Sequence, residues 1–266
     1  MSGYLHGSDR ETSRLFEQAA YLRQWFAPHW TLPDSGTVLE VGCGVGAQTA
    51  WLLEQHPALQ FHCIDANPDQ IEIARTTLQP FVAQGRATID CLDVVDIAPN
   101  HQFDGALFIW VLEHVPDALE ALVASGRALK PGAGICCTEV LNSSFHHCPA
   151  SQPLTHYWEQ FNELQRHLGG DPDVGSRLPA LLAEAGFREI QVQPVSLFFS
   201  DHHPDARREF FSYWSTLLAS AAPGLQEAGK IGGAELSEMV AACAELGSRA
   251  GSVLSYTAMV ASARIQ

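Results

Sequence analysis

The sequence predicts an α/β fold, a doubly wound sheet with mainly parallel strands and an antiparallel edge strand, plus helical cap segments. Two observations predict it. Short apolar, β-branched runs alternate with helical segments along residues 36–140, which favours a parallel sheet with right-handed crossovers. Glycines or carboxylates directly follow several of these runs. Because ligand sites in such sheets lie beyond the carboxyl ends of the strands, these residues are expected to converge on one site.

The turn after the first predicted strand is the most informative stretch. Residues 37–41 form a short apolar run broken only by Glu40, which is typical of a buried strand. Glycine then occupies every second position of residues 42–46, and residues 50–55 favour a helix. This order brings backbone N–H groups and a helix N-terminus together, so the corner suits an anionic or strongly polar ligand group. Glycine lets such a ligand approach the backbone closely, which disfavours a purely structural turn.

Two further predicted strands end in acids. Residues 61–65 form a strand that ends at Asp65, and residues 87–91 form a strand that leads to Asp93, with a helix at residues 69–78 between them. A carboxylate at the tip of the second strand can accept hydrogen bonds from a ribose diol. Asp93 can accept a hydrogen bond from an exocyclic amine such as that of adenine, and a solvated loop acid is the alternative interpretation. These acids support a nucleoside ligand.

The N-terminal segment precedes the sheet. Residues 1–10 have the character of an extended arm, and residues 11–27 have apolar positions at helical spacing. The simpler interpretation is an arm that packs on the core. The sharper hypothesis is a lid that closes over the ligand, because Tyr4 and His6 offer polar tips.

The remaining segments complete the sheet and add caps. Further strands are predicted at residues 103–110, 135–140, 189–199 and 252–265. Helices are predicted at residues 154–168 and 177–185, with two or three more in 203–250, and residues 142–153 are predicted to form a loop. We expect an N-terminal cap of residues 1–35 and a main domain of residues 36–266, with cap segments at about 142–175 and 203–250.

The composition disfavours several partners. The chain has 266 residues and a formal net charge of −15, which repels nucleic acid and anionic membranes at long range. Most of the seven cysteines lie in or beside predicted buried strands, as small apolar residues of a reduced protein do. No apolar run reaches about 18 residues. We expect a cytoplasmic monomer or homodimer with no nucleic-acid and no membrane partner.

Four short motifs occur in a fixed order: E-V-G-C-G-V-G at residues 40–46, F-D-G-A at 103–106, V-L-E-H-V-P-D at 111–117 and L-K-P-G-A-G at 129–134. Together with the acid at Asp65, their order and spacing resemble the class I S-adenosylmethionine (SAM) dependent methyltransferases of small molecules. The G-x-G-x-G spacing differs from the G-x-G-x-x-G of dinucleotide enzymes. The resemblance implies a Rossmann-like fold, SAM as the cofactor with S-adenosylhomocysteine (SAH) as product, and an antiparallel pair of strands at one sheet edge.

The resemblance also implies which residues bind the cofactor. These are Glu40, Gly42, Gly44, Gly46, Gln48, Asp65, Ala66, Asp93, Val94 and Trp110. Trp110 could instead pack in the core.

Catalytic residues are harder to identify, because SAM carries an activated methyl group and the enzyme mainly positions the acceptor. A general base helps only where the acceptor proton has a high pKa. The catalytic candidates are His114, His6 and Tyr4, with His146 and His147 as weaker candidate bases. No metal site is predicted, since residues 146–148 and 201–203 lack a diagnostic zinc spacing.

The leading hypothesis is a SAM-dependent methyltransferase that acts on a small-molecule acceptor at O or N, with a secondary metabolite as one candidate. The alternatives are an NAD-dependent oxidoreductase and a non-catalytic SAM-binding protein. Aromatic residues of the predicted cap suit a planar or apolar acceptor, although they could simply pack the cap. They are Tyr157, Trp158, Phe161, Phe210, Phe211 and Trp214.

Overall fold

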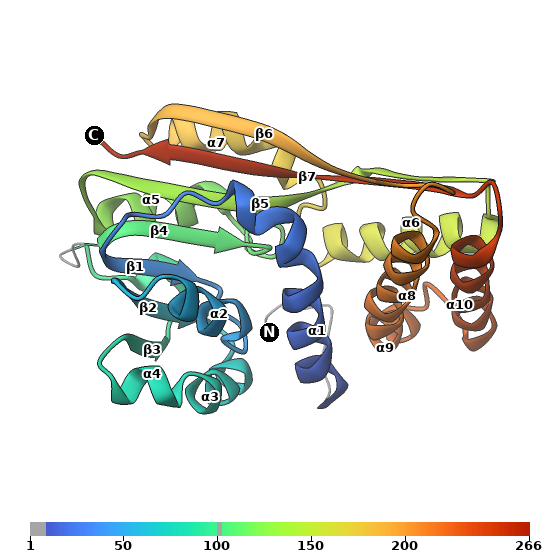
Figure 1. Ribbon diagram of the computed structural model, residues 1–266, viewed down its shortest axis with the longest axis horizontal. Coiled ribbons are helices and arrows are strands. Elements are labelled where there is room, and N and C mark those ends of the chain that lie inside the picture. The colour runs from blue at the N-terminus through green and yellow to red at the C-terminus, as the bar shows by residue number, and fades with distance from the viewer. Residues whose placement is uncertain (1–8, 100–102) are drawn as a thin grey trace.

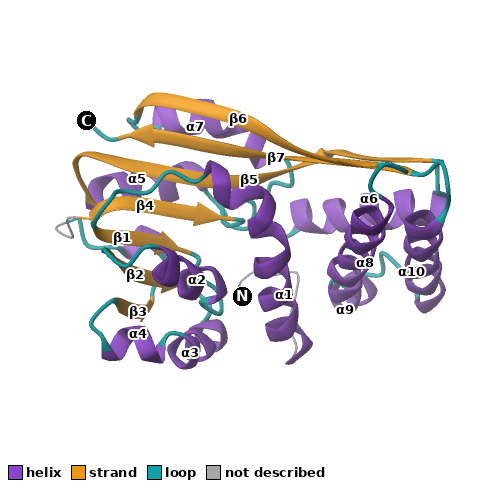
Figure 2. Ribbon diagram, viewed as in Figure 1, coloured by secondary structure: helices purple, strands orange, loops and turns teal. Residues whose placement is uncertain are grey.

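The structure is a computed structural model that describes residues 9–99 and 103–266. Within these residues seven strands form one sheet, and helices flank it on both faces (Figures 1 and 2). The strands are β1 (Gly36–Val41), β2 (Leu59–Asp65), β3 (Ala87–Cys91), β4 (Phe103–Ile109), β5 (Leu129–Cys148), β6 (Arg188–Phe199) and β7 (Val253–Arg264).

The strand order is β3-β2-β1-β4-β5-β7-β6. Neighbouring strands from β3 to β5 are parallel, whereas β7 is antiparallel to both β5 and β6. The predicted mainly parallel sheet with an antiparallel pair at one edge is confirmed, with β7 one position inside the edge and β6 at the edge itself. The strand order reverses between β1 and β4, and open α/β sheets bind ligands at such a switch point.

Most of the helices lie close to their predicted positions, and the short helix at Gln79–Ala83 was not predicted. The helix predicted at residues 50–55 begins at Ala47, after Gly46 in a left-handed conformation. The helices are α1 (Asp9–Phe26), α2 (Ala47–Gln55), α3 (Pro68–Thr77), α4 (Gln79–Ala83), α5 (Ala118–Ala128), α6 (Gln152–His167), α7 (Leu178–Glu184), α8 (Pro204–Ser220), α9 (Ala222–Glu227) and α10 (Gly233–Ser248). None of the described helices is both long and apolar enough to cross a bilayer.

The two faces of the sheet bury different residues, because successive strand side chains point to opposite faces. Cys136 belongs to the core that contains α2, α3, α6 and α8, whereas Cys137 belongs to the core that contains α5 and α7. Leu107 and Phe108 divide in the same way. All seven cysteines of the chain lie in the described part and are free thiols.

The length of β5 corrects the sequence prediction. The strand predicted at residues 135–140 spans Leu129–Cys148, so much of the loop predicted at residues 142–153 is strand. Its second half pairs with β7 after a register shift. At this irregularity Ser144 Oγ donates to the Thr257 carbonyl (3.1 Å) and accepts from the Thr257 N–H (2.9 Å). These bonds satisfy backbone groups that the ladder leaves unpaired, which is why a polar stretch remains in the sheet.

The long strands create the space for a ligand. β5, β6 and β7 run past the carboxyl ends of the other strands, and α6, α8 and α10 lie beneath their extended halves (Figure 1). α1 lies between these helices and α2, and its Leu22 and Phe26 are buried in the same core. The carboxyl ends of β1, β2 and β4 therefore face helices that come from both ends of the chain.

Candidate functional site

One cavity of about 490 Å³ lies beyond the carboxyl ends of β1, β2 and β4. The end that is predicted to bind the cofactor, the cofactor end, is formed by the glycine turn, by Asp65 at the tip of β2 and by Asp93 after β3. The other end, the acceptor chamber under the same prediction, has walls from the loop after β4 and from β5, α6, α8 and β7. The chamber residues are Glu113, His114, Asn142, Trp158, Phe161, Phe210, Tyr213, Trp214 and Tyr256.

Most of the predicted site residues meet in this cavity. Those on its wall are Glu40, Gly42, Gly44, Gln48, Asp65, Ala66, Asp93, Val94, Trp110 and His114. Gly46 is not on the described wall. It caps α2 with φ 76°, and a Cβ there would lie 3.0 Å from Leu78 Cγ, so its role in the structure is in the turn. Tyr4 and His6 lie outside the described residues, and the lid remains a prediction.

The glycine turn is tied to the tip of β2. The Gly44 N–H donates to Asp65 Oδ2 at 2.9 Å, and the Asn67 N–H donates to Asp65 Oδ1 at 2.8 Å. Burial raises the pKa of Asp65, while these two hydrogen bonds and the nearby His114 oppose that rise. Each carboxylate oxygen keeps a lone pair for a further donor. The corner can therefore hold a diol while its own backbone groups stay paired.

The Glu40 side chain lies beside the glycine turn and is hydrogen-bonded to the first turn of α2. Its Oε2 accepts a hydrogen bond from Thr49 Oγ1 at 2.6 Å, and the Cys63 thiol lies 3.9 Å away. Burial raises the pKa of Glu40 to about 7, while the hydrogen bonds from Thr49 and Cys63 oppose that rise. The side chain links β1 to α2, because Thr49 lies in the first turn of that helix.

Asp93, which follows β3, and Trp110, which follows β4, both lie on the cavity wall. Asp93 Oδ1 accepts from the Val95 N–H at 3.2 Å and so caps a short 3₁₀ turn on the cavity wall. Trp110 follows β4 with φ 59°, a conformation that costs a non-glycine residue about 1–3 kcal/mol. Its ring packs edge-on against Phe26 with centroids 5.1 Å apart. The Trp110 side chain therefore lies between the cavity and the core.

His114 lies at the junction of the two ends. Its Nε2 is 3.7 Å from Glu113 Oε1, and Glu113 Oε2 accepts from Gln165 Nε2 at 2.7 Å. Behind this loop Glu139 is fully buried, and its Oε1 accepts the N–H groups of Val111 (3.1 Å) and Leu112 (2.9 Å). The loop after β4 is thus held by side chains from β5 and α6. His114 can accept a proton from a group bound in the chamber.

The pKa of the Glu139 carboxyl is raised above its ordinary value. Burial raises its pKa to about 8, the charge of Glu113 adds to the rise, and backbone hydrogen bonds oppose it. Its second oxygen, Oε2, has no hydrogen-bond partner among the described residues.

The structure adds wall residues that the sequence did not single out. Arg14 is 5% exposed, donates to Gln18 Oε1 and lies with it on the cavity wall. Tyr256 donates to Asn142 Oδ1 at 3.0 Å inside the acceptor chamber. The spacing of Arg14 and Gln18 could have indicated that they share one face of α1, because they lie one helical turn apart beside its apolar stripe.

The histidines of the second half of β5 do not form a metal site. His147 Nδ1 lies 3.0 Å from the Pro149 carbonyl, and its Nε2 lies 3.3 Å from Thr155 Oγ1. Residues 146–148 are consecutive strand positions, so their side chains alternate between faces. Across the described residues no group of three or more His, Cys, Asp or Glu side chains could hold a metal ion.

Residues 39–135 match the family described as "Methyltransferase domain". Among curated proteins, the O-methyltransferase cnsE of Penicillium expansum is 31% identical over 161 residues, which cover 59% of this chain and 54% of that protein. The O-methyltransferase resE of Aspergillus sclerotiorum is 28% identical over 169 residues, which cover 60% of this chain and 61% of that protein. The chain therefore matches only about half to three fifths of the length of these relatives.

Solved structures share the whole architecture at low sequence identity. The cyclase SpnF aligns over 94% of this chain and 80% of its own, with a TM-score of 0.56 and 21% identity. Geranyl diphosphate methyltransferase in complex with SAM aligns over 94% of this chain and 85% of its own, with a TM-score of 0.55 and 13% identity. At these identities the likeness shows the fold alone, and the predicted Rossmann-like sheet is confirmed.

Proposed function

We propose that this chain, whose fold and matched segment are those of the class I SAM-dependent methyltransferases, transfers a methyl group from SAM to a hydroxyl oxygen of a small molecule. One observation carries the proposal. A single cavity joins the glycine turn and two strand-end acids to a histidine and an aromatic chamber. A nucleoside cofactor and an acceptor can therefore meet inside one cavity. The curated relatives named O-methyltransferases favour oxygen as the acceptor atom.

The cofactor end fits SAM in its donor and acceptor groups. In this proposal Asp65 accepts hydrogen bonds from the ribose hydroxyls, and Asp93 accepts one from the adenine amine. Gly44 leaves the backbone open, since a Cβ there would meet only Gln70 Oε1, at 3.2 Å. SAM supplies the activated methyl group, and the residues of this chain supply its position.

The acceptor chamber can position the acceptor and take up its proton. His114 lies on the wall near Asp65 and can take the proton of the acceptor hydroxyl. The buried rings of the chamber exclude water from the reacting atoms, which suits a transfer that depends on alignment at about 3–3.5 Å. The segments 142–175 and 203–250 act as the cap over the acceptor in this proposal.

The proposal retains the expectations of a cytoplasmic location, of a monomer or homodimer, and of Tyr4 and His6 as further catalytic candidates. The relatives reported above support neither the NAD-dependent oxidoreductase nor the non-catalytic SAM-binding protein.

The experiment combines binding and turnover with the full chain. Calorimetry with SAH and with NAD should give micromolar binding of SAH alone. Methyl-labelled SAM, incubated with the protein and a panel of phenols, alcohols and amines, should give a labelled methyl ether. Binding of NAD without SAH, or SAH binding with no labelled product from any acceptor, would remove the proposal.

A further inference from the structure

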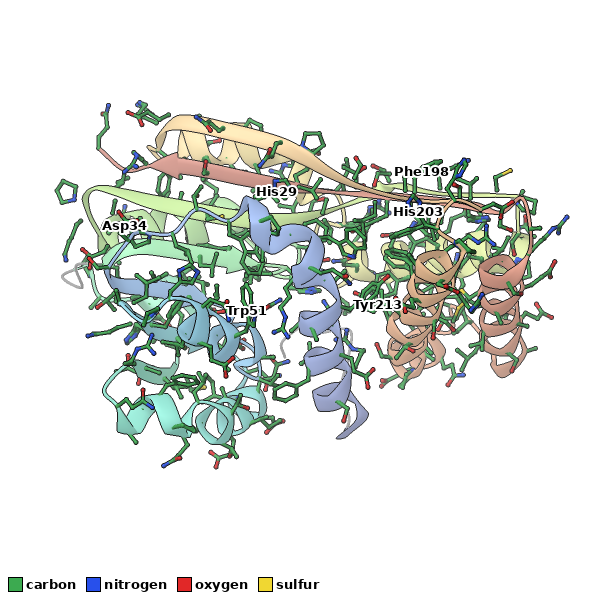
Figure 3. All side chains as sticks on the ribbon, in the orientation of Figure 1. His29, Asp34, Trp51, Phe198, His203 and Tyr213 are labelled. Atoms are coloured by element: carbon green, nitrogen blue, oxygen red, sulfur yellow. The ribbon has the colours of Figure 1, made fainter. Side chains whose placement is uncertain are left out.

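The loop that carries His114 forms a long part of the cavity wall. Its wall residues are Trp110, Val111, Glu113, His114, Val115 and Pro116. Residues 110–117 belong to no helix or strand. The wall that α8 contributes is different, because Figure 3 shows Tyr213 where α8 faces α1, and its ring stacks on Tyr21 of α1 with centroids 5.0 Å apart. The position of His114 therefore depends on the contacts that hold a loop.

Two consecutive residues of β5, Thr138 and Glu139, hold the start of this loop. The Trp110 N–H donates to the Thr138 carbonyl at 2.9 Å. The N–H groups of Val111 and Leu112 both donate to Glu139 Oε1, at 3.1 and 2.9 Å. Successive N–H groups converge on one acceptor where the backbone changes hand, and Trp110 supplies that change with φ 59°. Because Glu139 is fully buried, loss of its oxygen would leave two buried N–H groups without an acceptor.

Val111 links Glu139 to both ends of the cavity. Its carbonyl accepts the His114 N–H at 2.9 Å. Its side chain lies against the glycine turn, since a Cβ on Gly42 would be 2.6 Å from Val111 Cγ2. His114 is therefore placed relative to the glycine turn through one residue, and the N–H of that residue is held by Glu139.

The cofactor end has supports that do not involve this loop. The Gly44 and Asn67 N–H groups donate to the two oxygens of Asp65, and Thr49 donates to Glu40. These bonds join β1, β2 and α2 to one another. Loss of the Glu139 oxygen should therefore move His114 and leave the cofactor end in place.

We propose that Glu139 is a positioning residue for methyl transfer, which fixes His114 beside the glycine turn through hydrogen bonds to Val111 and Leu112. This inference rests on the proposed function with His114 as the base. Glu139 does not belong to the described cavity wall, so it acts through the loop. A displacement of about 1 Å in a reacting group can lower a rate about 10²-fold, which makes the placement of His114 consequential.

The test compares two variants of the full chain. Glu139→Leu removes the acceptor oxygen, whereas Glu139→Gln keeps one. Hydrogen exchange followed by NMR should show the Val111 and Leu112 amides protected in the unaltered chain and in Glu139→Gln, and exchanging at least tenfold faster in Glu139→Leu. Calorimetry should give SAH affinities within threefold of one another for all three proteins.

Rates are measured with labelled SAM and the acceptor that the panel of phenols, alcohols and amines identifies. Glu139→Leu should lower kcat about 10–100-fold with the KM for the acceptor within threefold, and Glu139→Gln should keep kcat within threefold. In a His114→Gln background, Glu139→Leu should cost less than threefold. A residue that acts through His114 has nothing left to position there, so the two losses are not additive.

Phe187→Leu is the matched control. Phe187 is also fully buried, lies in the core that contains α5 and α7, and does not belong to the described cavity wall. This variant should lower the midpoint of thermal unfolding and leave kcat unchanged. If Glu139→Leu does not fold, Glu139→Asp takes its place in every measurement, because it draws the carboxyl back from the loop by one methylene.

The outcomes separate this inference from the function on which it rests. Unchanged kcat in Glu139→Leu, an equal loss with and without His114, a Glu139→Gln variant as slow as Glu139→Leu, or unchanged exchange of the two amides would each overturn the inference and leave the proposed function standing. An unaltered chain that binds no SAH and methylates no acceptor would remove the proposed function, and this inference with it.

Discussion

The backbone N–H of Gly44 donates to Oδ2 of Asp65 over 2.9 Å, which ties the turn after β1 to the tip of β2. The other oxygen of Asp65 is held by the Asn67 N–H. The carboxylate therefore organises the corner and keeps lone pairs for a ligand. Substitutions of Asp65 and Gly44 should show separately how far the SAH affinity depends on the carboxylate and how far it depends on the backbone conformation of the turn.

Asp65→Ala should weaken SAH binding by about 1.5–3 kcal/mol, the range for hydrogen bonds to a charged group. Asp96→Ala is the control, because Asp96 is an exposed acid nearby that does not belong to the cavity wall. Calorimetry with both variants measures the difference. A change of only a few tenths of a kcal/mol for Asp65→Ala would show that Asp65 does not hold the ribose.

Gly44→Ala should lower both stability and SAH affinity, whereas Gly85→Ala should lower stability alone. Both glycines have a positive φ, 55° and 70°, where an L-residue costs about 1–2 kcal/mol. Gly44 lies on the cavity wall, and Gly85 lies in a turn where an added Cβ meets nothing within 4 Å. Thermal unfolding and calorimetry separate the two effects. Equal SAH affinity in both variants would place the ligand away from this turn.

Arg14→Gln should weaken SAH far more than 5′-methylthioadenosine. Arg14 is the one lysine or arginine on the described cavity wall, and an anionic ligand end is most stable beside it. SAH carries a carboxylate that methylthioadenosine lacks. We expect a loss of about 1.5–3 kcal/mol for SAH and a few tenths for methylthioadenosine.

Arg23→Gln is the control for that prediction. Arg23 lies over the ring of Trp51 at 5.3 Å and does not belong to the cavity wall. It should leave both affinities unchanged. Equal losses for the two ligands in Arg14→Gln would mean that Arg14 supports the fold of α1 and does not hold the carboxylate.

His114→Gln should lower kcat about 10²–10⁴-fold with SAH affinity nearly unchanged, which is the usual contribution of a general base. The measurement is methyl transfer to the identified acceptor, followed from pH 6 to pH 10. The variant should regain rate at high pH, where the acceptor ionises without a base. His202→Gln, at an exposed position outside the cavity wall, is the control. Full activity of His114→Gln would show that the proton of the acceptor hydroxyl passes to water and not to His114.

Stability should fall as pH rises from about 4.5 to about 8, in part because of Glu139. Its folded pKa of about 8 lies above its ordinary value of 4.5, so the folded state holds a proton that the unfolded state releases in this window. Glu139→Gln removes that proton exchange and should flatten the decline by on the order of 1–2 kcal/mol. Urea unfolding at pH 5 and pH 8 measures it.

Glu184→Gln is the matched control for the pH experiment, because Glu184 is exposed on α7. Its decline between pH 5 and pH 8 should equal that of the unaltered chain. The same decline in Glu139→Gln as in the unaltered chain would show that Glu139 is ionised in the folded protein throughout this range.

The cofactor end could be predicted from the sequence because its residues either lie close together in the chain or stand at the ends of parallel strands. A strand, a glycine turn and a helix follow one another within residues 37–55, and the carboxyl ends of parallel strands meet at one edge whatever surrounds them. Glu40, Gly44, Asp65 and Asp93 therefore reach one cavity as predicted. The mainly parallel sheet followed from the alternation of strands and helices, and the antiparallel pair at one edge followed from the family resemblance.

The acceptor chamber was decided only by tertiary structure. The second half of β5 looks like a polar loop, and it is a strand because Ser144 and β7 satisfy its hydrogen bonds across more than a hundred residues of chain. That extension carries α6 and α8 to the cavity and brings Trp158, Trp214 and Tyr256 together. No local pattern encodes such contacts, since side-chain stacking depends on elements that are distant in sequence. The sequence determined the strand-end corner that we propose as the nucleoside site, and the packing of α1, α6 and α8 against the long strands determined what can lie beside it.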